Sequence, residues 1–291
     1  MINEAIRKKI KLIKIHTNRL MQSTIMGDYT SAIKGSGLEF DQIREYQFGD
    51  DVRRIDWNSS AKGDKIMVKQ FIEERERTII LAIDISRSCQ YSSKEELRQD
   101  VIAQLAGTLA LVAGNNKDKV GALFFSDKIE KWIAPSRGPL HVGKILEAVF
   151  TIEPQGTKTS LENALKFLIN LKHRNAIVFM LSDWIDDEAS YKNALRIASC
   201  KYDLIGIRIL DQCEHTFPNI GLLEIEDPES GERFIINTTS LKNRSTFLQT
   251  RLAEQKQFFD RHALDILDIT IGRPFINSII SFFHRRIKRQ I

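Results

Sequence analysis

Between residues 78 and 210, short apolar runs alternate with longer amphipathic stretches, a pattern that predicts strands separated by helices. Four of the runs have the length and the β-branched content of buried strands: 78–84, 120–127, 176–183 and 203–210. A further strand is expected at 128–134. Helices are expected near 92–113, 139–151, 160–172 and 187–200. Strands separated by helices imply a parallel sheet covered on both faces, so we predict a doubly wound, mostly parallel α/β domain.

The start of the first of these helices has its own signal. Ser92 and Ser93 are each followed three residues later by a glutamate, Glu95 and Glu96. This spacing is typical of a capping box, in which the serine and glutamate side chains bind the free N–H groups of the first helical turn. We therefore predict a helix that begins at this point.

The chain outside this alternation is organised differently at its two ends. In residues 1–20 the apolar positions recur at helical spacing among lysines and arginines, which predicts an amphipathic helix with a cationic face. That face is either simply solvated or contacts an acidic lipid or partner. Residues 27–76 show little periodicity and form an irregular arm with short strands, one of them near 65–73.

Beyond residue 210 the pattern predicts a β-hairpin, formed by 222–227 and 232–237, followed by two helices near 240–262 and 274–290. We divide the chain into three parts. Residues 1–76 form the helix and the arm, 77–272 the α/β domain, and 273–291 a basic terminal helix.

Composition and charge narrow the classes of function. Hydrophobic residues make up 42% and charged residues 28% of the 291, which is ordinary for a soluble globular protein. Three widely spaced cysteines indicate reduced thiols, and no apolar run is long enough to cross a bilayer, so we expect a cytoplasmic protein. The net charge of +5 comes from the two basic ends, and residues 21–280 carry more acidic than basic side chains. A nucleic-acid-binding groove in the body is therefore not expected.

Oxygen-bearing side chains gather where the predicted strands end. The first strand leads into Asp84, Ser86 and Ser88, the turn before a helix contains Thr157 and Thr159, and another strand ends in Ser182-Asp183. Alternate residues project to the same side, so the first three can direct their oxygens at one point. A threonine hydroxyl and Asp183 would complete most of an octahedron of hard oxygen ligands, which suits Mg²⁺ or Mn²⁺. With only two carboxylates, such a site would accept an acidic group from a partner. The same residues are also ordinary turn and helix-capping residues, so the pattern has a purely structural interpretation as well.

These segments resemble the metal-ion-dependent adhesion site of von Willebrand factor A domains, which has Asp-x-Ser-x-Ser, Thr and Asp elements in this order. The resemblance implies five ligands: Asp84, Ser86, Ser88, Thr157 and Asp183. Thr157 is chosen over Thr159 because it directly follows a glycine, as in the family pattern. Two positions depart from relatives without removing an oxygen: Cys89 stands where many have Met, and Trp184 where many A domains have Gly.

The arm narrows the resemblance further. The segment 35–76 contains Arg44-Glu-Tyr and the run Gly49-Asp-Asp-Val-Arg-Arg-Ile-Asp-Trp57, and it is very similar to the signature of a bacterial family of unknown function, number fifty-eight. With the site, the resemblance covers about residues 24–240. It implies an adaptor or chaperone-like partner of a MoxR-type AAA+ ATPase. These residues have either a partner-docking role or a structural role, in which ion pairs hold the arm and Trp57 anchors it. The signature residues meant here are Arg44, Asp50, Arg53, Asp56 and Trp57.

We therefore predict a metal-dependent binding protein and not an enzyme. The main alternative is a metal-dependent phosphoryl-transfer enzyme, because a nucleophilic aspartate can also end a first strand. That chemistry uses a second acid two residues later, where this chain has Ser86. A P-loop-like run at 138–144 is followed by Ile145 in place of the Ser or Thr that binds Mg²⁺, so ATP hydrolysis is not expected there. A third interpretation is a scaffold with a vestigial site whose basic helices contact membrane or nucleic acid.

Overall fold

The computed structural model describes most of the chain. The described residues are 8–11, 13, 17, 39–63, 65–72, 77–90, 92, 97–173, 176–211, 221–226, 233–237, 242–262 and 264–290. They fall into two compact units, residues 33–77 and a larger unit that joins residues 1–32 to 78–291. Most of the predicted N-terminal helix lies outside the described residues, although positions 8–11, 13 and 17 are helical.

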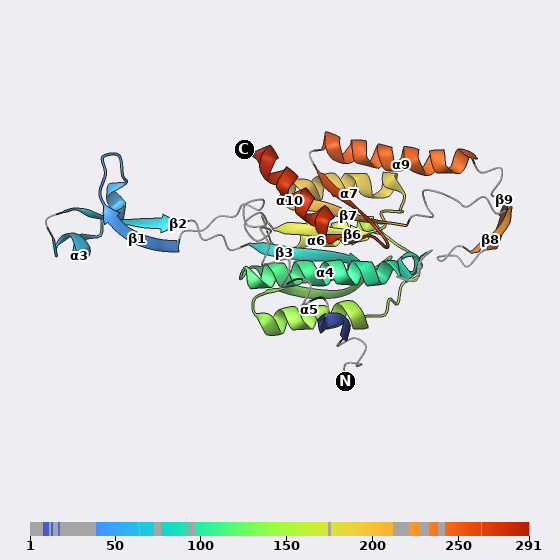
Figure 1. Cartoon of the computed structure of the whole chain (residues 1–291), viewed down its shortest axis with the longest axis horizontal. Coiled ribbons are helices and arrows are strands. Elements are labelled where there is room, and N and C mark those ends of the chain that lie inside the picture. Colours follow the sequence, from blue (N-terminus) through green and yellow to red (C-terminus); the bar gives the residue numbers. More distant parts are fainter. Residues whose placement is uncertain are drawn as a thin grey trace. The chain divides into compact units, whose positions relative to one another are not determined.

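The larger unit is built on a six-stranded sheet in the order β10-β7-β6-β3-β4-β5 (Figure 1). Its strands are β3 (Thr78–Asp84), β4 (Lys119–Phe125), β5 (Ile129–Ser136), β6 (Ile177–Ser182), β7 (Asp203–Leu210) and β10 (Asp265–Thr270). Strand β3 pairs in parallel with β4 and β6, and β7 pairs in parallel with β6 and β10. Only β5 is antiparallel to its neighbour. The predicted α/β class and the mostly parallel sheet are confirmed.

Helices cover both faces of this sheet, as expected for buried parallel strands. They are α4 (Arg98–Asn115), α5 (Pro139–Thr151), α6 (Leu161–Asn170), α7 (Glu188–Lys201), α9 (Lys242–Arg261) and α10 (Ile276–Gln290). One face buries the apolar sides of α6 and α7 together with Phe259 of α9 against Ile80, Ala82 and Val178. Helices α4 and α5 pack together on the other face (Figure 1). The core therefore lies on both sides of β3 and β6, the strands that carry the candidate site.

Helix α4 begins at Arg98, and its N-cap residue, Leu97, makes no side-chain capping hydrogen bond. The capping boxes predicted at Ser92 and Ser93 include residues 93–96, which lie outside the described residues, so they stay a prediction. The hydroxyl of Ser92 donates to Asp211 at 3.3 Å. Strand β10 was not predicted at all, and it adds a sixth strand at the edge next to β7.

Helix α10 belongs with the larger unit, although we had set residues 273–291 apart. Ile279, Phe282 and Phe283 on its apolar side are buried, and the helix contacts β10. Arg286 of α10 forms ion pairs with Asp203 and Asp265, which lie at the starts of β7 and β10. The predicted hairpin is present as β8 (Leu222–Glu226) paired with β9 (Arg233–Asn237). No helix among the described residues has both the length and the apolar composition needed to cross a membrane.

The smaller unit is a two-stranded antiparallel sheet with short helices. Strand β1 (Glu39–Glu45) pairs with β2 (Met67–Ile72), and between them lie the 3-10 helix η1 (Val52–Arg54) and α3 (Trp57–Ser60). Asp56 caps α3 by accepting hydrogen bonds from the backbone N–H groups of residues 58 and 59. The irregular appearance of the sequence here thus reflects turns and short helices inserted into a single hairpin.

Candidate metal centre

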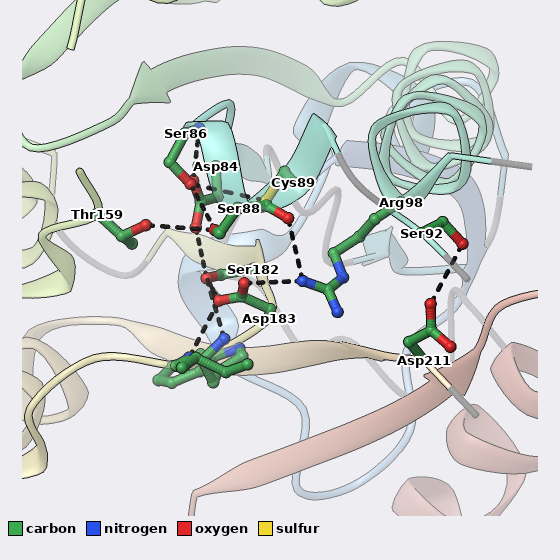
Figure 2. Close-up of polar contacts among 12 residues, drawn as sticks. Asp84, Ser86, Ser88, Cys89, Ser92, Arg98, Thr159, Ser182, Asp183 and Asp211 are labelled. Carbon is green, nitrogen blue, oxygen red and sulfur yellow. Dashed lines mark hydrogen bonds and ion pairs between the residues drawn. The ribbon is translucent and has the colours of Figure 1, made fainter. Parts of the chain in front are cut away.

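Asp84 lies at the carboxyl end of β3 and is fully buried. Its Oδ1 accepts a hydrogen bond from the backbone N–H of Ser86 at 2.9 Å, which turns the chain out of the strand into the 3-10 helix η2 (Arg87–Gln90). Its Oδ2 accepts a hydrogen bond of 2.6 Å from the hydroxyl of Ser182, the last residue of β6 (Figure 2). The Asp84 carboxylate therefore joins the ends of two neighbouring parallel strands, which is where ligands bind in doubly wound sheets.

Three hydroxyl groups lie close together near the end of the strand that carries Asp84. The Oγ atoms of Ser86 and Ser88 are 3.0 Å apart, and the Oγ of Ser88 is 3.5 Å from the Oγ1 of Thr159 (Figure 2). Thr157, which we had preferred as the ligand, is solvent-exposed. The structure thus brings Ser86, Ser88 and Thr159 together, and it does not place Thr157 among them.

The loop that carries both threonines is held by Glu130 of β5. The Oε1 of Glu130 accepts hydrogen bonds from the Ser126 hydroxyl at 2.6 Å and from the backbone N–H groups of Gln155 and Gly156 at 3.0 and 2.8 Å. Burial opposes the charged form of Glu130, but these hydrogen bonds keep its pKa below the ordinary value. Gly156 fits only because it lacks a side chain, since a Cβ there would lie 2.2 Å from the Ser126 Oγ.

Asp183, the residue after β6, supplies the second carboxylate. Its Oδ1 accepts from the backbone N–H of Ile185 and its Oδ2 from the Nη1 of Arg98, each at 3.0 Å. The side chains of Arg98 and Asp183 are 6% and 0% exposed, so this ion pair is buried. Arg98 also donates to the backbone carbonyl of Ser88 at 3.2 Å, and it therefore ties the two halves of the site together.

Arg98 was not among the residues predicted from the sequence. It is a basic residue in the first turn of α4, where the helix dipole disfavours a positive charge. The carboxylate of Asp183 offsets this unfavourable position, and that contact joins segments 85 positions apart in the chain, so no local sequence signal identifies it.

The two carboxylates make the site strongly electronegative. Burial, together with the charge of Asp183, raises the pKa of Asp84 to about 7. Burial and the same two carboxylates also raise the pKa of the buried Cys89 thiol, whose Sγ is 3.8 Å from the Ser86 Oγ. A cation bound here would relieve the repulsion between the carboxylates, because an opposite charge favours the ionised form of each.

The donor set fits a hard divalent cation. The oxygens that meet are those of two carboxylates and three hydroxyls, which suit Mg²⁺ or Mn²⁺ and lack the nitrogen and thiolate ligands typical of zinc sites. Within the described ranges, no three His, Cys, Asp or Glu side chains come together as a metal-binding group. A metal at this site would therefore depend on the hydroxyls of Ser86, Ser88 and Thr159 as much as on the two aspartates.

Trp184 follows Asp183 directly and fixes the backbone there. Its φ of 58° lies in the left-handed region, which a tryptophan rarely adopts. The side chain is 1% exposed and packs edge-on against Tyr191 and Phe259, with ring centroids 6.0 and 5.1 Å away. Gln255 of α9 donates to the backbone carbonyl of Trp184 at 2.9 Å. These contacts hold the strained residue in place, and its positive φ explains why a glycine would be accepted at this position.

The signature residues of the arm make mostly local contacts within the smaller unit. Arg44 forms a two-pronged ion pair with Asp50, with N–O distances of 2.8 and 2.7 Å. Arg53 pairs with its near neighbour Asp51 on the surface, and not with Asp50 or Asp56. The helix-capping Asp56 lies 3.8 Å from Lys69. Trp57, which we had considered as an apolar anchor, is 68% exposed. The choice between a docking and a structural role for these residues stays open.

Comparison with known proteins yields a family match and several distant relatives. The family model described as "Protein of unknown function DUF58" matches residues 42–257. An uncharacterized protein of Mycobacterium tuberculosis, Rv1480, is 25% identical over 224 residues, which span 76% of this chain and 70% of the relative. Among solved structures, an aerotolerance-related membrane protein from Bacteroides fragilis is similar with a TM-score of 0.46 at 15% identity, covering 73% of this chain and 99% of that one. A von Willebrand factor type A structure from Catenulispora acidiphila is similar with a TM-score of 0.44 at 12% identity, covering 88% and 50%.

Proposed function

Since the chain belongs to the family described as protein of unknown function DUF58, and since its sheet gathers two buried carboxylates at one end, we propose that it is a divalent-metal-dependent protein-binding module. The metal would be Mg²⁺ or Mn²⁺. Asp84, Ser86, Ser88 and Asp183 would hold it, as the sequence predicts, with Thr159 as the threonine that lies beside them.

One observation carries the proposal: Asp84 and Asp183 are both buried at the ends of β3 and β6, and of these two only Asp183 forms an ion pair among the described residues. Asp183 is paired with Arg98, whereas Asp84 is bound by the hydroxyl of Ser182 and by a backbone N–H. The raised pKa of Asp84 reflects the unfavourable free energy of ionising a buried carboxyl group next to Asp183. A divalent cation next to Asp84 would remove that cost, because it stabilises the carboxylate in its ionised form.

The bound cation would supply an open coordination position for a carboxylate from outside. Two aspartates and one arginine leave the protein ligands with a single net negative charge, so a divalent ion would keep a positive charge. An acidic residue of a protein partner would neutralise it. The chain's own residues contribute the rigid end of the sheet and the hydroxyls that orient the ion. On the basis of the resemblance to the MoxR-associated family, the proposed partner is a MoxR-type AAA+ ATPase, for which the chain would be an adaptor.

The proposal also takes the chain to be a binding protein and not an enzyme. The residue two positions after Asp84 is Ser86, whose hydroxyl contacts Ser88 and cannot serve as the acid that phosphoryl transfer from an aspartyl group needs. The test is a screen of wild type and Asp84→Asn for Mg²⁺-dependent phosphatase activity. Turnover that is lost in the variant would establish the enzyme alternative. The cytoplasmic location stays a prediction from the sequence.

The metal is tested with two matched serine variants. Ser88→Ala removes a proposed ligand, whereas Ser92→Ala removes a hydroxyl that donates to Asp211 and is not a proposed ligand. Titration with Mn²⁺, followed by the loss of the free-ion electron paramagnetic resonance signal, should show one bound ion per wild-type chain and weaker binding in Ser88→Ala alone. Equal Mn²⁺ binding in all three proteins would overturn the metal proposal.

The partner is tested with purified components. The chain would be immobilised and a MoxR-type ATPase encoded in the same genome passed over it in Mg²⁺ or in EDTA. We expect retention in Mg²⁺, loss in EDTA and loss in Asp84→Asn. Retention that is indifferent to EDTA would separate the ATPase partnership from the metal, and absence of retention in Mg²⁺ would remove the ATPase from the proposal while leaving the metal result standing.

A further inference from the structure

Strand β10 forms an open edge of the sheet. Of the strands that the structure describes, it pairs with β7 alone. Alternate backbone N–H and C=O groups of an edge strand point away from its neighbour and are free to pair with another chain. Proteins usually cover such an edge or guard it with charged side chains.

A cavity of about 630 Å³ lies along this edge. One wall is α9, with Lys256 and Asp260, and the other is α10, with Ser281 and Arg285. The floor contains residues of β10 that alternate between the two faces of the sheet, such as Leu267 and Asp268. The cavity therefore lies beside the strand, between the two helices.

A buried arginine faces this cavity with unused hydrogen-bonding capacity. Arg286 is 9% exposed and lines the cavity. Its Nη2 donates to Asp203, and its Nη1 lies 3.5 Å from the Asp265 carboxylate. Among the described residues, neither its Nε nor its Nη1 has a hydrogen-bond partner. Buried N–H groups of a guanidinium that lack an acceptor are costly, so an external acceptor would be stabilised here.

The charges around the cavity favour an acidic ligand. Of its carboxylates, Asp268 is bound by two nitrogens of Arg208, and Asp265 pairs with Arg286 and Arg289. By contrast, Arg285 and Lys256 are exposed cations on opposite walls. The third carboxylate, Asp260, is exposed on α9 one helical turn from Lys256, so the lining as a whole has four basic and three acidic side chains.

We propose that this groove binds an extended, acidic peptide segment of a partner protein, which adds to the sheet as a strand beside β10 and places a carboxylate at Arg286. The edge of β10 that no described strand pairs with supplies main-chain hydrogen bonds, and the apolar wall formed by Leu264, Leu267 and Phe282 receives alternate side chains of the peptide. Asp268 and the arginines of α10 discourage strands of other composition from pairing. The groove shares no residue with the metal centre.

The groove is tested with the full chain in EDTA, so that the proposed metal centre takes no part. Random octapeptides displayed on phage would be selected on the wild-type protein, and the enriched peptides would be synthesised with a fluorescent label. Binding would be measured by anisotropy against Arg285→Glu and Lys288→Glu. Both residues are exposed on α10, but only Arg285 lines the groove, so the second variant controls for the change in charge.

We expect the enriched peptides to contain Asp or Glu and to bind Arg285→Glu at least about tenfold more weakly than wild type. Binding to Lys288→Glu should stay within about twofold of wild type, since a charge outside the groove contributes little. Methylation of alternate peptide backbone nitrogens should abolish binding, because it removes the strand hydrogen bonds. Three results would each overturn the proposal: no enrichment, peptides without acidic residues, or equal loss of binding in the two variants.

Discussion

Arg98 and Asp183 form a buried ion pair that joins the first turn of α4 to the end of β6, with an N–O distance of 3.0 Å. The pair places one positive charge of the chain within a site that contains two carboxylates. Because Arg98 also holds the Ser88 carbonyl, the same guanidinium fixes the serine turn and the second aspartate relative to each other. The site is therefore preorganised by the chain's own cation before any metal binds.

Replacing this arginine should destabilise the protein strongly. In Arg98→Met an unbranched apolar stem remains but the guanidinium is lost, so Asp183 loses its buried partner, and we expect the free energy of unfolding in EDTA to fall by about 3–5 kcal/mol. Addition of Mg²⁺ should recover part of that loss, because the metal replaces the missing positive charge. Urea denaturation with and without Mg²⁺ measures both effects.

An exposed arginine provides the control for that experiment. Arg196 lies on the solvent side of α7, and Arg196→Met should change the free energy of unfolding by no more than about 0.5 kcal/mol. If Arg98→Met were as stable as Arg196→Met in EDTA, the ion pair would not be holding the site as described.

The raised pKa of Asp84 predicts a specific dependence of stability on pH. The pKa is about 7 in the folded protein, owing to burial and the charge of Asp183, against 3.8 for an unperturbed aspartate. Between these values the folded chain holds a proton that the unfolded chain has lost. The free energy of unfolding in EDTA should therefore fall as the pH rises through this window, by a few kcal/mol, and level off above about 7.

The contribution of Asp84 is isolated by comparison with Asp84→Asn, which cannot ionise. Urea denaturation of both proteins at several pH values between about 4 and 8 gives the difference in their free energies of unfolding. Wild type should lose stability relative to the variant as the pH rises, and saturating Mg²⁺ should reduce or reverse that trend. A difference that does not change with pH would show that Asp84 ionises normally.

The sequence predicted the strands and the order of the oxygen-bearing segments, because both depend on residues close together along the chain. It could not predict Arg98, whose partner Asp183 lies 85 positions away and meets it only through the packing of α4 on the sheet. The choice of Thr157 over Thr159 depended on a loop conformation that Glu130 sets from another strand. Strand β10 was missed because Asp265 and Asp268 interrupt its apolar pattern, as is usual at a sheet edge.

Gly156→Ala tests the anchoring of the threonine loop. The new Cβ would lie 1.8 Å from the Asp127 Oδ1 and 2.2 Å from the Ser126 Oγ, so the loop must move away from Glu130. We expect a destabilisation of about 1–3 kcal/mol and weaker Mn²⁺ binding, since Thr159 moves with the loop. Gly143→Ala is the matched control, because nothing lies within 4 Å of its Cβ and the residue is inside α5. That substitution should be neutral or stabilising by up to about 1 kcal/mol.

Trp184→Gly compares the free energy of backbone strain with that of side-chain burial at the residue that follows Asp183. Glycine adopts a φ of 58° freely, which relieves about 1 kcal/mol or more of strain. The loss of a buried indole packed on Tyr191 and Phe259 should cost about 3–5 kcal/mol, so the net change in the free energy of unfolding is a loss. Metal binding by the folded variant should survive. The Ile185 N–H donates to the Asp183 carboxylate, and glycine at position 184 can maintain the backbone conformation that this hydrogen bond needs.

Trp184→Phe provides the contrasting variant. It keeps an apolar ring in the cavity but retains the strained φ, so it should be more stable than Trp184→Gly while still less stable than wild type. Urea denaturation and Mn²⁺ titration of both variants separate the two contributions. If Trp184→Gly were the more stable of the two, the free energy of the backbone strain at this position would exceed the stabilisation that the packed ring provides. The role of Trp184 would then lie in the geometry of the site and not in the stability of the fold.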